Sequence, residues 1–143
     1  HNKDRGVLII MKMEDVIETD LETIFPDMTL GDLINIISKS TRNIYPVVER
    51  NSGKLLGIVT LDEVRNIMFR SELYGRFKVR KLMVSPPAKI LYNTPMDKVM
   101  DLFEGTGAWN LPVVDKGGVY KGFVSKSKIF SSYRELLVHY SHD

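Results

Sequence analysis

The sequence predicts a mixed α+β fold of two similar halves, each with the element order β-α-β-β-α. Two predicted strands share an apolar-Pro-Val-Val-acid pattern, at residues 44–49 (IYPVVE) and 110–115 (NLPVVD). Each is followed by a turn and a second strand, which ends in GIVT at residues 57–60 or GFVS at residues 122–125. The prolines lie 66 positions apart and the glycines 65, which indicates an internal duplication. Because strands this short do not form independent domains, we expect the halves to pack together around a pseudo-two-fold axis.

The lead-in segment and the first helix come before the first proline. Residues 7–17 predict a short strand followed by a helical turn, and residues 21–25 predict a second short strand. Thr29 predicts a helix start, because its hydroxyl and Asp32 have the spacing of a capping box. The face of this helix that we expect to be buried consists of Leu30, Leu33, Ile34 and Ile37.

The first half ends in a predicted hairpin and a helix. Residues 44–49 and 55–60 form the two strands, and the turn between them contains Asn51, Ser52 and Gly53. The next helix is expected to begin at Leu61 and to bury Val64, Ile67 and Met68. The basic residues of the connector 70–80 favour a solvated linker over a contact with an anion or acidic lipid.

The second half repeats this order. Residues 79–83 lead in, residues 88–91 form a strand, and Pro95 is expected at the first position of a helix. The buried face of this helix is expected to hold Met96, Val99, Met100 and Phe103. The strands follow at residues 109–115 and 120–125. The last helix is expected to pack on the lead-in segment or on another subunit through one apolar side, formed by Ile129, Phe130, Tyr133, Leu136, Leu137 and Tyr140.

Composition limits the classes of function. The chain has 143 residues, 43% of them hydrophobic, which is one domain by length with a sizeable core. A net charge of +2 argues against a nucleic-acid partner, and the absence of cysteine excludes disulfides, thiolate metal sites and cysteine catalysis. No apolar run approaches the roughly 20 residues that span a bilayer. We therefore expect a soluble domain or a soluble piece of a larger, even membrane-bound, protein; His1 and Asn2 are interpreted as a tag remnant or as native residues.

The repeated strand pattern and the Gly-apolar-apolar-Ser/Thr turn resemble the cystathionine-β-synthase (CBS) domain, here as a tandem pair. The predicted organisation is a lead-in segment at 1–12, a first repeat at 13–74 and a second repeat at 75–143. Residues 107–114 and 122–130 further resemble the second CBS repeat of prokaryotic CLC chloride channels and transporters. This resemblance implies a regulatory module on the cytoplasmic face of the membrane, a homodimer, and a transmembrane chloride-transport domain as partner. A magnesium transporter or a nucleotide-synthesis enzyme is the alternative host.

The resemblance implies an adenine-nucleotide site, for ATP, ADP or AMP, in the cleft between the repeats. In the first repeat Thr60 matches the phosphate-binding hydroxyl and Glu63 matches the acid that binds the ribose hydroxyls, where the family more often has Asp. The residues expected to line the adenine pocket are Leu21, Ile44 and Tyr45. The alternative for Thr60 and Glu63 is a capping box that needs no ligand.

The second site, at Ser125, Lys128 and Leu111, is expected to be degenerate. Lys128 replaces the acid, and an ammonium group cannot accept hydrogen bonds from ribose. Ser125 is therefore interpreted chiefly as a helix cap, with plain anion binding as the alternative. Trp109 is expected to be a packing residue at the seam between the repeats.

Other functions have less support from the sequence. No acid/base pair, nucleophile or glycine-rich phosphate motif indicates an enzyme. The histidines, His1, His139 and His142, are expected to lie in solvated ends of the chain rather than in a metal site. A ligand-free dimerisation module is the main alternative to a nucleotide sensor, and no cofactor is expected to be required.

Overall fold

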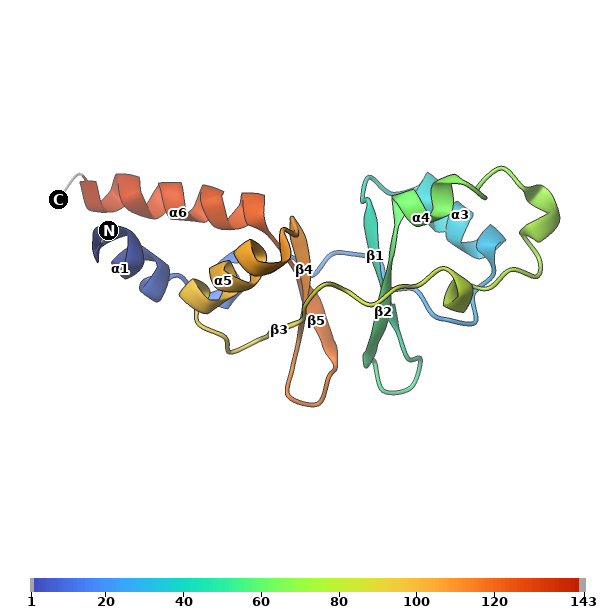
Figure 1. Cartoon of the computed structure of the whole chain (residues 1–143), viewed down its shortest axis with the longest axis horizontal. Coiled ribbons are helices and arrows are strands. Elements are labelled where there is room, and N and C mark those ends of the chain that lie inside the picture. The colour runs from blue at the N-terminus through green and yellow to red at the C-terminus, as the bar shows by residue number, and fades with distance from the viewer. Residues whose placement is uncertain (1, 142–143) are drawn as a thin grey trace. The chain divides into compact units, whose positions relative to one another are not determined.

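The computed structural model describes residues 2–141, and the side chains of residues 6–139 within them. Helices and strands are mixed along the chain (Figure 1), and the second repeat has the predicted order β-α-β-β-α, whereas the first has α-β-β-α. The helices are α1 Asn2–Ile10, α2 Met13–Val16, α3 Leu30–Ser38, α4 Leu61–Arg65, α5 Met96–Thr106 and α6 Lys126–Ser141. The strands are β1 Ile44–Val48, β2 Leu55–Thr60, β3 Ile90–Leu91, β4 Asn110–Val114 and β5 Tyr120–Ser125. The α+β class and the two repeats are thereby confirmed.

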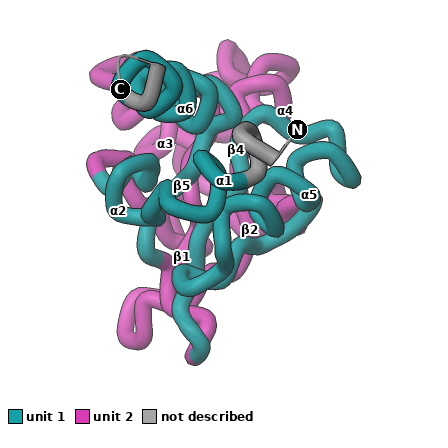
Figure 2. Tube along the Cα trace, turned by 90° about the vertical axis from the view of Figure 1, so that its left-hand side faces the viewer, with its two compact units in different colours: residues 1–19, 87–116, 121–143 teal, residues 20–86, 117–120 magenta. Residues whose placement is uncertain are grey.

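The chain forms two compact units, which Figure 2 distinguishes by colour. Unit 2 contains residues 20–86 and 117–120, and therefore the first repeat with the connector that follows it. Unit 1 contains residues 1–19, 87–116 and 121–143, and therefore the second repeat with the lead-in segment. This spatial division differs from the predicted sequence boundaries, because each segment that precedes a repeat belongs to the unit of the other repeat.

The strands of the two units pair in the same way. In unit 2, β1 and β2 are antiparallel, and Ile24 forms a single parallel bridge to Val47. In unit 1, β3 pairs in parallel with β4 at Ile90 and Val113, and β5 pairs with β4 on its other side. The strand predicted at residues 21–25 is therefore reduced to one bridge at Ile24.

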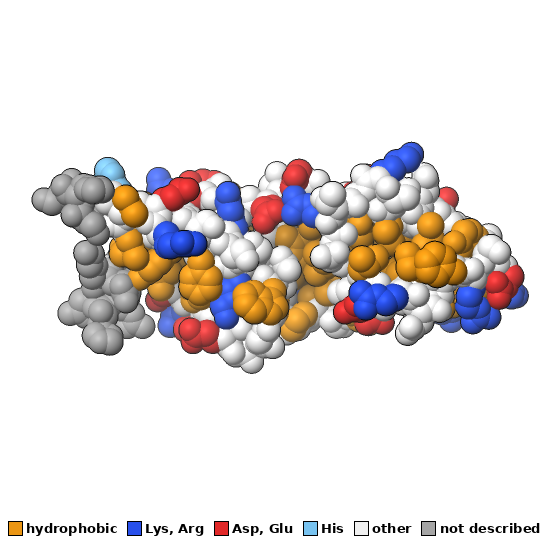
Figure 3. Space-filling model, turned by 90° about the horizontal axis from the view of Figure 1, so that it is seen from above, with side chains coloured by type: hydrophobic (Ala, Val, Ile, Leu, Met, Phe, Trp, Pro, Cys, Tyr) orange, Lys and Arg blue, Asp and Glu red, His pale blue; other side chains and the backbone are white. Residues whose placement is uncertain are grey.

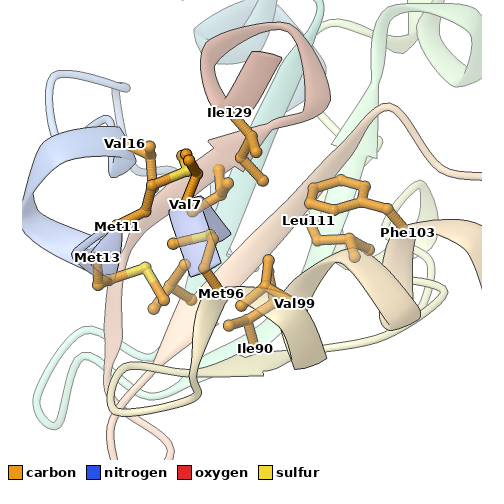
Figure 4. Close-up of a cluster of buried hydrophobic side chains, with 12 residues drawn as sticks. Val7, Met11, Met13, Val16, Ile90, Met96, Val99, Phe103, Leu111 and Ile129 are labelled. Atoms are coloured by element: carbon orange, nitrogen blue, oxygen red, sulfur yellow. The ribbon is translucent and has the colours of Figure 1, made fainter. Parts of the chain in front are cut away.

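The core of unit 1 joins the lead-in helices to the second repeat (Figure 4). The buried cluster consists of Val7, Met11, Met13, Val16, Ile90, Met96, Val99, Phe103, Leu111, Val113, Val124 and Ile129. The strand predicted within residues 7–17 is wrong: this segment is helical in α1 and α2, and its apolar residues meet α5 and α6. The predicted packing of α6 on the lead-in segment is confirmed for Ile129, Tyr133, Leu136 and Leu137, whereas Phe130 is exposed; the side chain of Tyr140 lies outside the described residues.

The core of unit 2 is built around α3 and the β1–β2 hairpin. Its buried cluster consists of Ile24, Leu30, Leu33, Tyr45, Val47, Val59, Val64, Val79 and Leu82. The capping box predicted at Thr29 is confirmed: the Asp32 amide donates to Thr29 Oγ1, and the Thr29 amide donates to the Asp32 carboxylate, both at 3.1 Å. The connector also contributes, because Val79 is fully buried.

Three local predictions need correction. Pro95 is the N-cap of α5 rather than its first helical residue. Helix α4 ends at Arg65, so Ile67 and Met68 lie in the turns that follow it. Trp109 is not a packing residue, because 66% of it is exposed and its ring contacts the Lys126 ammonium, 5.3 Å from the ring centre.

Candidate functional site

The first turn, residues 57–63, joins β2 to α4 and carries the predicted nucleotide residues. Thr60 has the extended backbone of a helix N-cap, but its side chain makes no capping hydrogen bond. Among residues 6–139, neither the Thr60 hydroxyl nor the exposed Glu63 carboxylate has a hydrogen-bond or ion-pair partner. The predicted capping box at Thr60 is therefore wrong, and both polar groups remain available to another molecule.

The neighbouring acid of the first turn is occupied. Asp62 forms an ion pair with Arg65, with 2.9 Å between the carboxylate oxygen and the guanidinium nitrogen. The first helical amide, that of Leu61, donates to the Asn43 carbonyl at 2.9 Å. Glu63 is thus the acid of this turn that has no partner within the described chain.

The second turn, residues 122–128, joins β5 to α6 and is internally satisfied. Ser125 Oγ accepts a hydrogen bond from the Lys128 amide at 3.0 Å, which confirms Ser125 as a helix cap. Ser125 Oγ also donates to Glu18 Oε1 over 3.4 Å. The Lys126 amide donates to the Trp109 carbonyl at 2.9 Å, which repeats the Leu61–Asn43 bond of the first turn.

A crossing segment lies against the glycine of each turn. In unit 2, Val84 exchanges two backbone hydrogen bonds with Ile58, both of 2.9 Å. In unit 1, Glu18 exchanges the same pair with Phe123, at 2.7 and 2.9 Å. A Cβ atom on Gly57 would lie 2.9 Å from the Val84 carbonyl oxygen, and one on Gly122 would lie 2.5 Å from that of Glu18. Glycine is required at both positions because the crossing backbone occupies the space of a side chain.

The residues predicted to line the adenine pocket differ in exposure. Tyr45 is fully buried in the core of unit 2, and its hydroxyl donates to the Arg42 carbonyl at 3.0 Å. Leu111 is fully buried in the core of unit 1, Leu21 is buried, and Ile44 is half-buried. The Tyr45 ring and the Leu111 side chain therefore support their strands from within the cores, and the assignment of both residues to ligand sites stays a prediction.

Sequence reasoning missed a polar cavity of about 470 Å³ in unit 2. It lies at the end of α3 and is lined by Asp20, Glu22, Asn35, Ile36, Lys39, Ser40, Thr41 and Arg42. Arg42 forms an ion pair with Asp20 at 2.7 Å, and Lys39 has no ion-pair partner among the described residues. The run of basic and hydroxyl residues at 39–42, just before β1, was the only part of this cavity that the sequence could have indicated. Asp20 and Glu22 come to lie beside that run only in the folded chain.

Two classes of site are not found in the described part of the chain. Residues 2–141 contain no group of three or more histidine, cysteine, aspartate or glutamate residues arranged to hold a metal ion. In the same range, no helix combines the length and the hydropathy needed to cross a bilayer.

Two curated relatives come from Methanocaldococcus jannaschii. An uncharacterized protein is 28% identical over 128 residues, which are 87% of this chain and 45% of that protein. An inosine-5'-monophosphate dehydrogenase is 28% identical over 109 residues, which are 76% of this chain and 21% of the enzyme. The chain thus spans less than half of the length of either relative.

Two solved structures share the fold. The protein CbpB, solved in complex with c-di-AMP, has a TM-score of 0.80 at 11% identity, over 99% of this chain and 96% of that one. The CBS domain of the bacterial CNNM/CorC family Mg²⁺ transporter was solved in complex with ATP. It has a TM-score of 0.77 at 16% identity, over 92% of this chain and 93% of that one. At these identities the likeness concerns the fold alone.

The family model that matches is that of the CBS domain, and it matches twice. The matched residues are 13–70 and 79–135, which together cover most of the chain and both predicted repeats. Each match contains one proline-containing strand and one strand-to-helix turn. The chain belongs to the CBS domain family, as a tandem pair of CBS domains.

Proposed function

We propose that this CBS pair is a regulatory module that binds an adenine nucleotide at the first turn. Thr60 meets a phosphate oxygen, and Glu63 accepts hydrogen bonds from the ribose hydroxyls. The observation that carries the proposal is that both side chains lack a partner in the described chain, whereas the equivalent Ser125 has two. Because α4 has five residues, binding rests on these side chains more than on a helix dipole.

The two structural neighbours support the class of ligand. One was solved with ATP and the other with c-di-AMP, and both ligands contain adenine, ribose and phosphate. In this chain the base is assigned to the region of Leu21 and Ile44. Tyr45 contributes by holding β1 in place through its bond to Arg42. The position of the ligand between the repeats remains a prediction.

Regulation would follow from a shift in population. A nucleotide that binds one arrangement of the two repeats more tightly than another stabilises that arrangement in proportion to the difference in affinity. The proposal involves binding without a chemical step. The proposed role is therefore regulatory and not enzymatic.

The host protein is a further proposal, carried by sequence motifs. Residues 109–112 and 125–127 resemble the chloride-transport family, which implies a homodimer at the cytoplasmic face of the membrane beside a transmembrane chloride-transport domain. The relatives described above instead include an inosine-5'-monophosphate dehydrogenase and a magnesium transporter. Sequencing the parent reading frame beyond this chain tests the proposal, and a parent without chloride-channel helices would contradict it.

A ligand-free dimerisation module is the second candidate, and one observation favours it. Phe69, which follows α4, is 87% exposed. Hydrophobic side chains gather over the part of the chain that contains α3 and α4 (Figure 3). Exposed apolar surface of this kind is typical of protein–protein contacts.

Thermal melting with and without millimolar ATP, ADP or AMP, at two protein concentrations, tests the nucleotide proposal. Ligand at 100 times its Kd stabilises the folded state by about 2.7 kcal/mol, so a rise of several degrees in Tm is expected. Glu63→Ala should abolish most of this rise. Asp62→Ala is the matched control, because it removes an adjacent carboxylate that already has a partner.

The outcomes separate the two candidates. A nucleotide-dependent rise that Asp62→Ala retains and Glu63→Ala loses supports the site. Equal rises in both variants would contradict the assignment of Glu63. A Tm that does not change with nucleotide but rises with protein concentration would instead support the dimerisation module.

A further inference from the structure

The carboxylate of Glu18 reaches the second turn from a distant part of the sequence. Its Oε1 lies 3.4 Å from Ser125 Oγ, although 107 positions separate the two residues. The contact is long for an O–H···O hydrogen bond, so it does not by itself hold Glu18 in place. The two backbone hydrogen bonds between Glu18 and Phe123 do that, because they fix the crossing segment on β5.

Within the described residues, the segment that crosses the first turn brings no carboxylate to it. Val84 crosses β2 at Ile58 just as Glu18 crosses β5 at Phe123, and Val84 lies 66 positions after Glu18. The repeats therefore place an acid in one crossing segment and an apolar side chain in the other. This difference lies outside the strand-to-helix motif, so the motif alone does not show it.

We infer that Glu18 closes the second turn to anionic ligands and thereby limits the pair to one nucleotide. The inference rests on the proposed function for the class of ligand, an adenine nucleotide bound through its phosphate. Ser125 has one hydroxyl proton, and Glu18 Oε1, at 3.4 Å, is the acceptor within its reach, while its lone pair accepts the Lys128 amide. A phosphate oxygen at Ser125 would compete for that proton.

Charge strengthens this closure. The Glu18 carboxylate is tethered at the hydroxyl, so its effective concentration there exceeds that of a ligand in solution. A phosphate that displaced it would also lie beside a like charge in a half-buried position, where screening by water is reduced. Lys128 is exposed and carries the positive charge that an opened turn would offer to a phosphate.

Exchanging the two crossing residues tests the inference. Isothermal titration calorimetry with ATP, AMP and inorganic tripolyphosphate measures the number of sites in the whole chain and in four variants. We expect one ATP per chain in the wild type, two in Glu18→Val, and one in Glu18→Val combined with Glu63→Ala. Val84→Glu should weaken ATP binding at the first turn at least tenfold, since it places a carboxylate where the second turn has one.

Glu18→Gln keeps the size of the side chain and removes its charge, and it should open the second turn in the same way. A Glu18→Val or Glu18→Gln protein that melts as the wild type does and gains no site for any probe overturns the inference. Failure of the proposed function has a different result: the wild type then binds no nucleotide, while the Glu18 variants still gain a site for tripolyphosphate. Loss of ATP binding in Glu18→Gln alone would also overturn the inference, because Glu18 would then be a ligand-binding acid.

Discussion

The two strand-to-helix turns share their backbone hydrogen bonds but differ in whether their hydroxyl groups have partners. In each, a crossing segment pairs with the second strand, and the first helical amide donates to the residue before the proline-containing strand. Ser125 of the second turn is bonded to Lys128 and Glu18, whereas Thr60 of the first turn is bonded to neither its own helix nor a crossing side chain in the described chain. Conservation of the backbone pattern therefore does not imply conservation of the ligand site, because side chains outside the motif decide whether its hydroxyl is available.

The largest expected effect concerns the shared backbone. Gly122→Ala places a Cβ 2.5 Å from the Glu18 carbonyl oxygen at a residue whose φ is +155°, and should lower the free energy of unfolding by about 2–4 kcal/mol. Gly57→Ala, at 2.9 Å from the Val84 oxygen, should cost about 1–3 kcal/mol. Urea denaturation measures both values. Gly105→Ala in α5 is the control, because nothing lies within 4 Å of its Cβ, and a loss equal to that of Gly122→Ala would contradict the crossing-segment account.

An intermediate effect distinguishes the hydroxyls of the two turns. Without ligand, Ser125→Ala should lower the free energy of unfolding by about 1 kcal/mol, because it removes the cap of the Lys128 amide. Thr60→Ala should change it by less than about 0.5 kcal/mol, because no capping bond is lost. Chemical denaturation in nucleotide-free buffer checks this difference. Equal losses at the two positions would mean that Thr60 also has a structural role.

The smallest expected effect is on a pKa, and it concerns the ion pair between Arg50 and Asp27, whose two residues are present only in the first repeat. Arg50 Nε donates to both carboxylate oxygens of Asp27, at 3.0 and 3.1 Å, and this hydrogen bonding lowers the pKa of Asp27 below its ordinary value. The second repeat has Asn93 and Lys116 at the positions 66 residues later, so it cannot form this pair. Arg50→Gln should therefore raise the pKa of Asp27 toward that of a free aspartate, which NMR titration of the carboxyl carbon measures.

The sign of the pH effect follows from that lowered pKa. A carboxyl group whose pKa is lower in the folded state stabilises the fold above its unfolded pKa and loses this contribution as the pH falls through the folded pKa. Arg50→Gln should therefore flatten the acid side of the stability curve slightly, below about pH 4. Because both side chains are about half exposed, the effect should be small, and an unchanged Asp27 pKa would contradict the role of Arg50.

Local patterns were sufficient where the deciding neighbours lie within a few residues. The capping box of Thr29 and Asp32 was predicted because both partners belong to one helical turn. The same spacing at Thr60 and Glu63 failed, since the Thr60 side chain makes no capping bond and the turn leaves both groups without partners. The spacing therefore indicates a capping box but does not determine whether it forms.

By itself, the sequence determined the duplication and the α+β order of elements. The reason is that strand pairing and amphipathic faces depend on periodic patterns along the chain. Only the tertiary structure decided that Tyr45 and Leu111 belong to the cores, that the lead-in segment packs on the second repeat, and that Glu18 reaches Ser125. These contacts join residues far apart in the sequence, so they depend on which segment crosses which strand, and no local pattern records that.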